Sequence, residues 1–230
     1  MSLNVLGVIA RALRMHGEIA DGETPAGSLG ADMLVAANAM KRAWFGTLIG
    51  PRMSPQAFSG TMGQAENGGE YVVPGGAAFT VTAPLNPKAG ARFGVVDGAA
   101  DFGSNACTVS GNARLVHPIS GAAAASVSLT VNGQNARWWY RGDTATWTLE
   151  QDWPDLASAI EFPDPIIAYM PYMLAVEIAS EFGADITPEM GQGAMEGRQA
   201  LARSYARRGV AGNDQVIGLT AAAPAQPQGR

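Results

Sequence analysis

The segment 92–115 holds the residue types best suited to metal or phosphate chemistry. It contains Asp-Phe-Gly at 101–103, a triplet that holds a metal in protein kinases, and it places Asp97, Asp101 and Asn105 at spacings that suggest a calcium loop. A kinase also needs a glycine-rich loop, a strand lysine and a His-Arg-Asp loop upstream, which this sequence lacks. A calcium loop of the EF-hand type needs a closing glutamate, and none follows. The sequence therefore predicts that Asp97 and Asp101 build glycine-containing turns.

Histidine and cysteine are too sparse to indicate a metal site or a nucleophile. His16 and His117 are the two histidines, about a hundred residues apart, and neither belongs to a pattern typical of metal ligands. We expect both to be surface or hydrogen-bonded side chains. Cys107 lies in a strand-like run and is expected to fill the core. The sequence thus predicts no catalytic residue, no metal and no cofactor.

Four aromatic residues, Trp138, Trp139, Tyr140 and Trp147, form the strongest candidate binding surface. In a strand, Trp138 and Tyr140 share one face while Trp139 lies on the other. We expect one face to belong to the core. The other face could contact a neighbouring subunit or stack on sugar, and the pattern favours core plus interface over a carbohydrate platform.

The composition is poor in charge and rich in small residues. Charged residues make up 15% of the chain, against about 25% in typical proteins, and the net charge is −5. An acidic chain without a basic stripe argues against a free-standing nucleic-acid binder. The low surface charge indicates either coverage by other subunits or a general bias toward small residues, and both explanations stay open.

The sequence also bears on the compartment. A single cysteine rules out an internal disulfide and suits a reducing environment. The N-terminus lacks the basic start of a secretion signal, and no apolar run approaches the roughly 18 residues of a membrane helix. We therefore expect a soluble protein, made in the cytoplasm and without a membrane partner.

Hydrophobic periodicity predicts helices at both ends of the chain. Apolar spacing predicts one over Leu3–Met15, with Ser2 as its cap, and a second over Ser28–Phe45. Near the other end, Asp164 and Pro165 begin a helical segment. Pro171 then either kinks that helix or restarts it, because proline is costly inside a helix.

The last predicted helix begins at Thr187 and Pro188, a cap followed by a proline at the first position. Its glycines at 191, 193 and 197 indicate either close approach of another backbone or a late start near Ala194. The segment 210–230 has too little apolar surface to fold alone, and we expect it to become ordered on docking.

Between the helices, short runs rich in Val, Thr and aromatic residues recur at intervals of about 8–12 residues, the pattern of a small all-β unit. Asn132-Gly133 reads as a hairpin connection between two of them. Residues 46–69 read as irregular. The predicted fold class is α+β: a four-helix body with an inserted antiparallel β sandwich or barrel. The expected parts are 1–69, 70–153, 154–209 and 210–230.

Three segments resemble the head-to-tail adaptors of short-tailed phages and gene transfer agents, also called tail accessory factors or packaged-DNA stabilisation proteins. Residues 6–44 contain a helix ending in a turn at Arg14–Gly17, then Gly-Glu-x-Pro at Gly22–Pro25, then a helix closing on Trp44. Residues 162–190 resemble the second signature of that family, a proline-initiated helix running to Phe-Gly before another proline-initiated helix. The middle of the chain resembles a β module found in phage tail and adaptor proteins.

The resemblance implies a non-enzymatic virion protein at the head–tail junction. Such adaptors form a ring of about twelve copies that links the portal protein to the tail tube or nozzle protein. Packaged double-stranded DNA passes through the ring without sequence-specific binding. Residues 154–209 carry eight acidic and four basic side chains, and such an acidic helical part could line a channel that repels DNA.

On this basis we assign three sets of contact residues. The portal-docking set is Val210, Val216, Ile217, Leu219, Pro224, Pro227 and Arg230. The ring-packing set is Leu6, Ile9, Leu13, Gly193, Gly197, Leu201 and Tyr205. The tail- or neighbour-contact set is Trp138, Trp139, Tyr140 and Trp147.

Two other functions stay open. The β module could recognise a glycan as part of a tail or fibre component, and Asp97 or Asp101 could serve a hydrolase.

Overall fold

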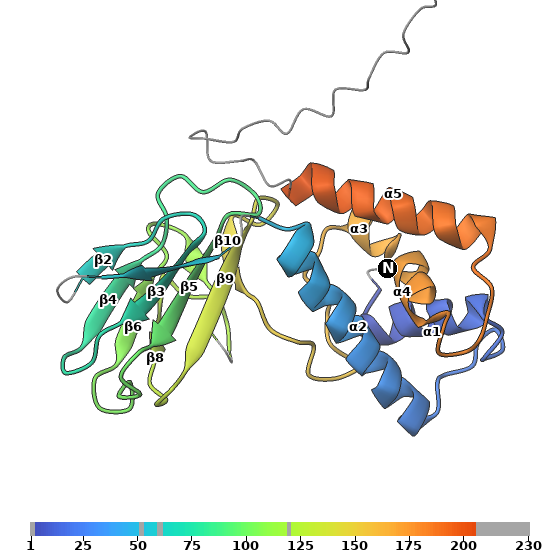
Figure 1. Ribbon diagram of the computed structural model, residues 1–230, viewed down its shortest axis with the longest axis horizontal. Helices are drawn as coiled ribbons and strands as arrows, with labels where there is room; N and C mark the ends of the chain where they lie inside the picture. The colour runs from blue at the N-terminus through green and yellow to red at the C-terminus, as the bar shows by residue number, and fades with distance from the viewer. Residues whose placement is uncertain (1–2, 51–52, 59–61, 119–120, 206–230) are drawn as a thin grey trace, which may run out of the picture.

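Helices from both ends of the chain pack into one helical body, and the strands between them form a β module beside it (Figure 1). The computed structural model describes residues 3–50, 53–58, 62–118 and 121–205. The fold class is α+β, as predicted. Within the described residues, no helix combines the length and the apolar character that a membrane span requires.

The two N-terminal helices are α1 (Val5–Met15) and α2 (Gly27–Thr47). The N-cap of α1 is Asn4, whose Oδ1 accepts a hydrogen bond of 2.9 Å from the backbone N–H of Gly7. The helix therefore begins two residues later than predicted, and Ser2 lies outside the described residues. Gly17 follows the end of α1 with a φ of 76°, a value that suits glycine.

The C-terminal helices are α3 (Asp164–Ile167), α4 (Met170–Ile178) and α5 (Pro188–Tyr205). Of the two alternatives for Pro171, the restart is correct: the proline lies in the first turn of α4, where its missing N–H breaks no helical hydrogen bond. Thr187 caps α5 as predicted, its Oγ1 accepting from Met190 N at 3.2 Å.

The central helix of the body is α4, which contacts α1, α2 and α5. Glu177 is its one charged residue, and its other residues are mainly apolar, as expected for a helix with several helical neighbours. Its buried residues are Met170, Pro171, Met173, Leu174, Ala175 and Ile178.

Two sheets face each other across the core of the β module (Figure 1). The six-stranded sheet has the order β1-β3-β5-β9-β10-β7, and the four-stranded sheet has the order β2-β4-β6-β8. The strands of the first sheet are β1 (Ser54–Ala57), β3 (Gly69–Val73), β5 (Arg92–Asp97), β7 (Leu115–Val116), β9 (Asn135–Arg141) and β10 (Thr146–Leu149). Those of the second are β2 (Met62–Gln64), β4 (Phe79–Thr82), β6 (Cys107–Ser110) and β8 (Ser126–Leu129).

The pairing within these sheets corrects the predicted antiparallel arrangement. From β1 to β6 the chain alternates between the sheets, so β1, β3 and β5 lie parallel in one, and β2, β4 and β6 lie parallel in the other. Among the described strands, the antiparallel pairs are β9 with β5, β9 with β10, and β6 with β8. Likewise, the Asn132-Gly133 turn is not a hairpin, because it joins β8 to β9 in the opposite sheet.

The β module also begins earlier than predicted. Strands β1 and β2 lie in the segment that we expected to be irregular, before residue 70. Their sequences, Ser-Pro-Gln-Ala and Met-Gly-Gln, carry no strand signal of their own, and they form by pairing with β3 and β4. Tertiary pairing thus overrides local propensity here.

Candidate functional site

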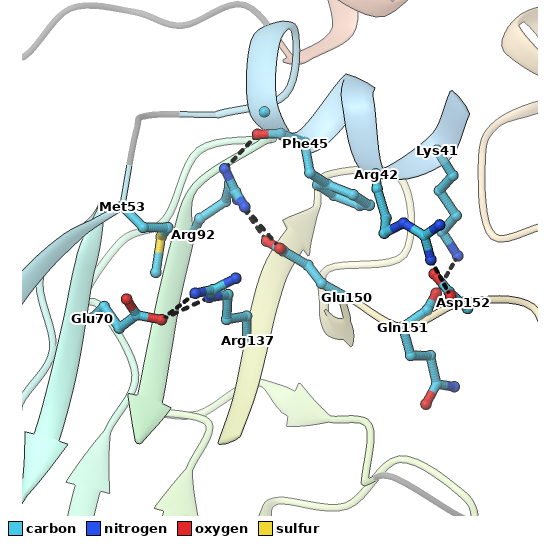
Figure 2. Close-up of a pocket in the computed structure, with 11 residues that line it drawn as sticks. Lys41, Arg42, Phe45, Met53, Glu70, Arg92, Arg137, Glu150, Gln151 and Asp152 are labelled. Carbon is cyan, nitrogen blue, oxygen red and sulfur yellow. Dashed lines mark hydrogen bonds and ion pairs between the residues drawn. The ribbon is translucent and has the colours of Figure 1, made fainter. Parts of the chain in front are cut away.

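One face of α2 binds the chain where it leaves the β module. Asn38, Lys41, Arg42 and Phe45 recur at the three- and four-residue spacing that places side chains on one side of a helix. Figure 2 shows Lys41 and Arg42 directed toward the segment after β10, where Gln151 and Asp152 lie. The cleft between them has a volume of about 590 Å³. It is a concave feature lined by several charged residues, and so a candidate site.

Arg92, the first residue of β5, joins the sheet to α2. Its guanidinium pairs with both carboxylate oxygens of Glu150, at 2.5 and 2.7 Å, and both side chains are more than nine-tenths buried. A further N–H donates to the carbonyl of Phe45 at 2.7 Å (Figure 2). That carbonyl lies in the last turn of α2, where carbonyls lack helical partners. Arg92 therefore caps α2 as well as neutralising Glu150.

Lys41 is almost fully buried beneath the segment that follows β10. Its ammonium donates to the carbonyl of Gln151 at 2.8 Å and forms an ion pair with Glu161. It also lies 4.4 Å from the ring centroid of Trp153. Burial lowers the pKa of Lys41, although the charge and hydrogen bond of Glu161 oppose that change. With 1% of its surface exposed, the amine is closed to substrates.

Two further contacts join α2 to the segment that follows β10, and a third lies within the β module at the edge of the cleft. The side-chain amide of Asn38 exchanges two hydrogen bonds with the backbone of Trp153, at 2.8 and 3.0 Å. At the rim, Arg42 pairs with Asp152 at 2.5 Å, and Arg137 of β9 pairs with Glu70 at 2.6 Å.

Each cation that lines the charged cleft has an anionic partner in the same chain. The charged residues of the cleft therefore form a contact between the helical body and the β module, and no cation among these described residues is left to bind an external anion. In the described ranges, no group of three His, Cys, Asp or Glu side chains could hold a metal ion. The residues of the junction can fix the β module to the body, and this is the clearest role that their geometry supports.

Sequence reasoning missed this junction, although one signal was present. Lys41 follows Ala37 by one turn and lies on the buried face of α2, among apolar residues. A charged residue on an apolar stripe indicates a buried ion pair. Its partner Glu161 lies 120 positions away and carries no such signal.

The aromatic set lies inside the chain, which corrects its assignment as a contact surface. Trp138, Tyr140 and Trp147 belong to the core of the β module, where Trp138 stacks on Phe93 at 5.2 Å. Trp139 lies on the opposite face of β9, as predicted, but that face is covered by the helical body. None of the four has more than 6% of its surface exposed, because each face of β9 has its own apolar partner and Trp147 of β10 lies in the core of the β module. They offer no open platform for sugar, tail protein or neighbour.

Most of the ring-packing set is likewise internal. Ile9, Leu13, Leu201 and Tyr205 are buried in the body of the same chain, because α1 and α5 both pack on α4. Leu6 is partly exposed.

Gly193 and Gly197 permit the close approach of α5 to its own neighbours. A Cβ at Gly193 would lie 2.5 Å from Cγ of Tyr172, and one at Gly197 would lie 2.8 Å from Cβ of Tyr169. Of the two explanations for these glycines, close approach is correct, but the partner is α4 and the turn before it.

Asp97 and Asp101 form turns, as predicted. The Asp97 carboxylate accepts from the backbone N–H groups of Asp101, Phe102 and Gly133 at 2.9–3.2 Å. Burial alone would raise the pKa of Asp97, but these hydrogen bonds outweigh it and hold the pKa below its ordinary value. Asp101 accepts from Gly76 N at 2.8 Å. Both carboxylates tie successive turns of the β module together, which leaves the hydrolase hypothesis without support.

The remaining candidate side chains are also occupied. His16 Nε2 lies 2.8 Å from the carbonyl of Ala175. Burial, with Arg141 nearby, lowers the pKa of His117. Cys107 is buried in the β core, and burial raises the pKa of its thiol to about 12. At neutral pH this cysteine is a thiol and a poor nucleophile.

An apolar groove of about 420 Å³ lies on α5 and the adjoining parts of the body, away from the junction. Its exposed large apolar residues are Ile186 and Met195, with 50% and 54% of their surfaces accessible. The other lining residues are Val176, Gly191, Ala194, Arg198, Gln199 and Ala202. We call this feature the α5 groove.

The portal-docking set at 210–230 lies outside the described residues. No family model matches the chain, and no curated protein matches it. A functional proposal therefore rests on the chain's own residues.

Proposed function

We propose that this chain is a non-enzymatic virion protein, a head-to-tail adaptor that forms a ring between the portal and the tail and conducts packaged DNA. The observation that carries the proposal is that helices α1 and α2 pack with α3, α4 and α5 in one helical body, with the β module inserted and fastened to it. An adaptor needs a rigid unit of this kind because it transmits load between two partners.

The residues that resemble adaptor motifs have structural roles here, which supports the proposal. Gly17 ends α1 with a positive φ, and Pro25 is buried directly before α2. Trp44 packs edge-on against Phe162 at 5.4 Å, which links the first signature to the start of the second. The two signatures thus form one packed unit.

The chemistry of the described residues also suits a structural protein. The charged groups of the junction are paired with one another, and the candidate nucleophiles are buried or hydrogen-bonded. The aromatic set offers no sugar platform, so no observation favours the glycan-binding alternative.

Electron microscopy of the chain, with and without its own portal ring, tests the proposal. Full-length protein should add a ring of density below the portal, and a chain ending at Gly209 should not. Circular dichroism of the shortened chain serves as the control for folding. Full-length protein that remains unbound to the portal would contradict the proposal.

A further inference from the structure

The α5 groove differs from other exposed apolar positions of the chain. Seven large apolar side chains are exposed among the described residues, and two of them, Ile186 and Met195, lie together on one concave surface. Single exposed apolar residues are ordinary, whereas a grouped pair over a groove indicates a contact surface.

The floor of the groove is made of small residues. Gly191 and Ala194 lie between the larger side chains, and a Cβ placed on Gly191 would meet only Ile186, at 3.9 Å. The absence of bulk at this point leaves room for an aliphatic side chain to enter. The groove therefore fits a short apolar segment better than a flat protein surface.

The sequence that follows α5 supplies such a segment. Twenty-five residues follow Tyr205, and three of the four Val, Ile and Leu residues among them fall within Val216–Leu219. The stretch before it contains Gly209, Gly212 and Asn213, residue types that favour a reversal of the chain. We propose that Val216–Leu219 of the same chain occupies the α5 groove.

The geometry permits this return. Helix α5 rises about 1.5 Å per residue, so the groove between Gly191 and Ala202 lies within about 21 Å of the end of the helix along its axis. The ten residues 206–215 can span up to about 33 Å when extended. A short tether also gives the segment an effective concentration in the millimolar range, which favours its own groove over that of a second copy.

This inference goes beyond the adaptor function and does not depend on it; because Val216, Ile217 and Leu219 also belong to the portal-docking set, portal docking would have to release them from the groove. It concerns the isolated chain, so its test needs no portal and can fail while the adaptor proposal stands.

Disulfide trapping in the full-length protein tests the proposal. The variant M195C/I217C is compared with the control V35C/I217C, in which Val35 of α2 is 65% exposed and remote from the groove in sequence. Cys107 does not compete, because it is buried and this burial raises the pKa of its thiol to about 12. Under mild oxidation, the first pair should form an intramolecular disulfide at least about tenfold faster than the control, seen as a monomer of altered mobility on non-reducing gels.

Two results would overturn the proposal. One is equal trapping of both pairs, and the other is a disulfide-linked dimer as the main product of M195C/I217C. A third variant, M195C/I217C with V216S and L219S, separates apolar binding from mere proximity. Its trapping rate should fall to that of the control, and an unchanged rate would also contradict the proposal.

Discussion

The junction cleft and the α5 groove are two concave features of one chain with opposite chemistry. The cleft is lined by charges, but each cation has a partner within the chain, and the central pair is buried. The groove is lined mainly by apolar groups, and its two largest lie half exposed without a partner among the described residues. The comparison teaches that a charged pocket can be internally complete, whereas a plain apolar surface can be the one that still needs a ligand.

The largest expected effect is loss of the buried pair at the junction. Arg92→Met should lower the free energy of unfolding by about 3–5 kcal/mol, because it leaves the Glu150 carboxylate buried without its cation. Chemical denaturation followed by tryptophan fluorescence measures the change. The matched control is Arg137→Met, since Arg137 is half exposed and its pair with Glu70 should contribute only about 0–1 kcal/mol. Equal effects would show that burial does not distinguish the two pairs.

Lys41 gives the second prediction, one with a defined pH dependence. Lys41→Met should cost about 1–3 kcal/mol at neutral pH, because Glu161 loses its ionic partner. In the folded protein the pKa of Lys41 lies below 10.5, so between that lowered pKa and 10.5 the unfolded chain binds more protons. The wild-type free energy of unfolding should therefore increase as pH rises toward 10.5.

Lys41→Met should accordingly lower the free energy of unfolding more near pH 10 than near pH 7, because the variant has no amine that loses a proton on folding. Urea titrations of both proteins at the two pH values measure the difference. A cost that is the same at both values, or that falls as pH rises, would contradict the assignment of Lys41 as a desolvated cation.

The contrast between these two regions also shows what sequence can predict. The runs that read as β3 to β10 all form strands, because their Val, Thr and aromatic content is local information. The antiparallel pairing that we predicted for these strands was wrong. A turn that crosses between two sheets uses the same residue types as a hairpin turn, and here Asp97, Asn132 and Gly133 form a turn that crosses between the sheets. Pairing partners are a property of the whole module.

The same limit applies to the candidate site. The alternation of Trp138 and Trp139 on two faces of β9 was predictable, because it follows from strand geometry. That both faces would be covered was not, since the cover of Trp139 comes from Phe45, Phe162 and Tyr205, three elements that are distant in sequence. Burial of an aromatic residue depends on tertiary contacts that its own neighbours in sequence do not encode.

The glycines of α5 sharpen the comparison at the edge of the groove. Gly197→Ala should destabilise the protein by about 1–2 kcal/mol, because its Cβ would meet Cβ of Tyr169 at 2.8 Å and the Met173 sulfur at 2.9 Å. Gly191→Ala, on the open side, should stabilise it by up to about 1 kcal/mol through helix propensity. Thermal unfolding of both variants measures the two effects. The same sign for both would mean that α5 does not pack on α4 as described.

The smallest effect on stability is expected in the α5 groove itself. Met195→Gln changes a half-exposed side chain and should lower the free energy of unfolding by at most about 1 kcal/mol, the apolar contact that it would lose with the segment. If Val216–Leu219 occupies the groove, the loss of about 1 kcal/mol of apolar contact should release the segment roughly fivefold more often. Trypsin cleavage after Arg207 or Arg208 should accelerate by a similar factor.

Val35→Gln, on α2, should leave the cleavage rate unchanged. Equal cleavage of wild type and Met195→Gln would show that the exposed methionine holds no segment of its own chain, and the groove would then lack the internal partner that the junction cleft has.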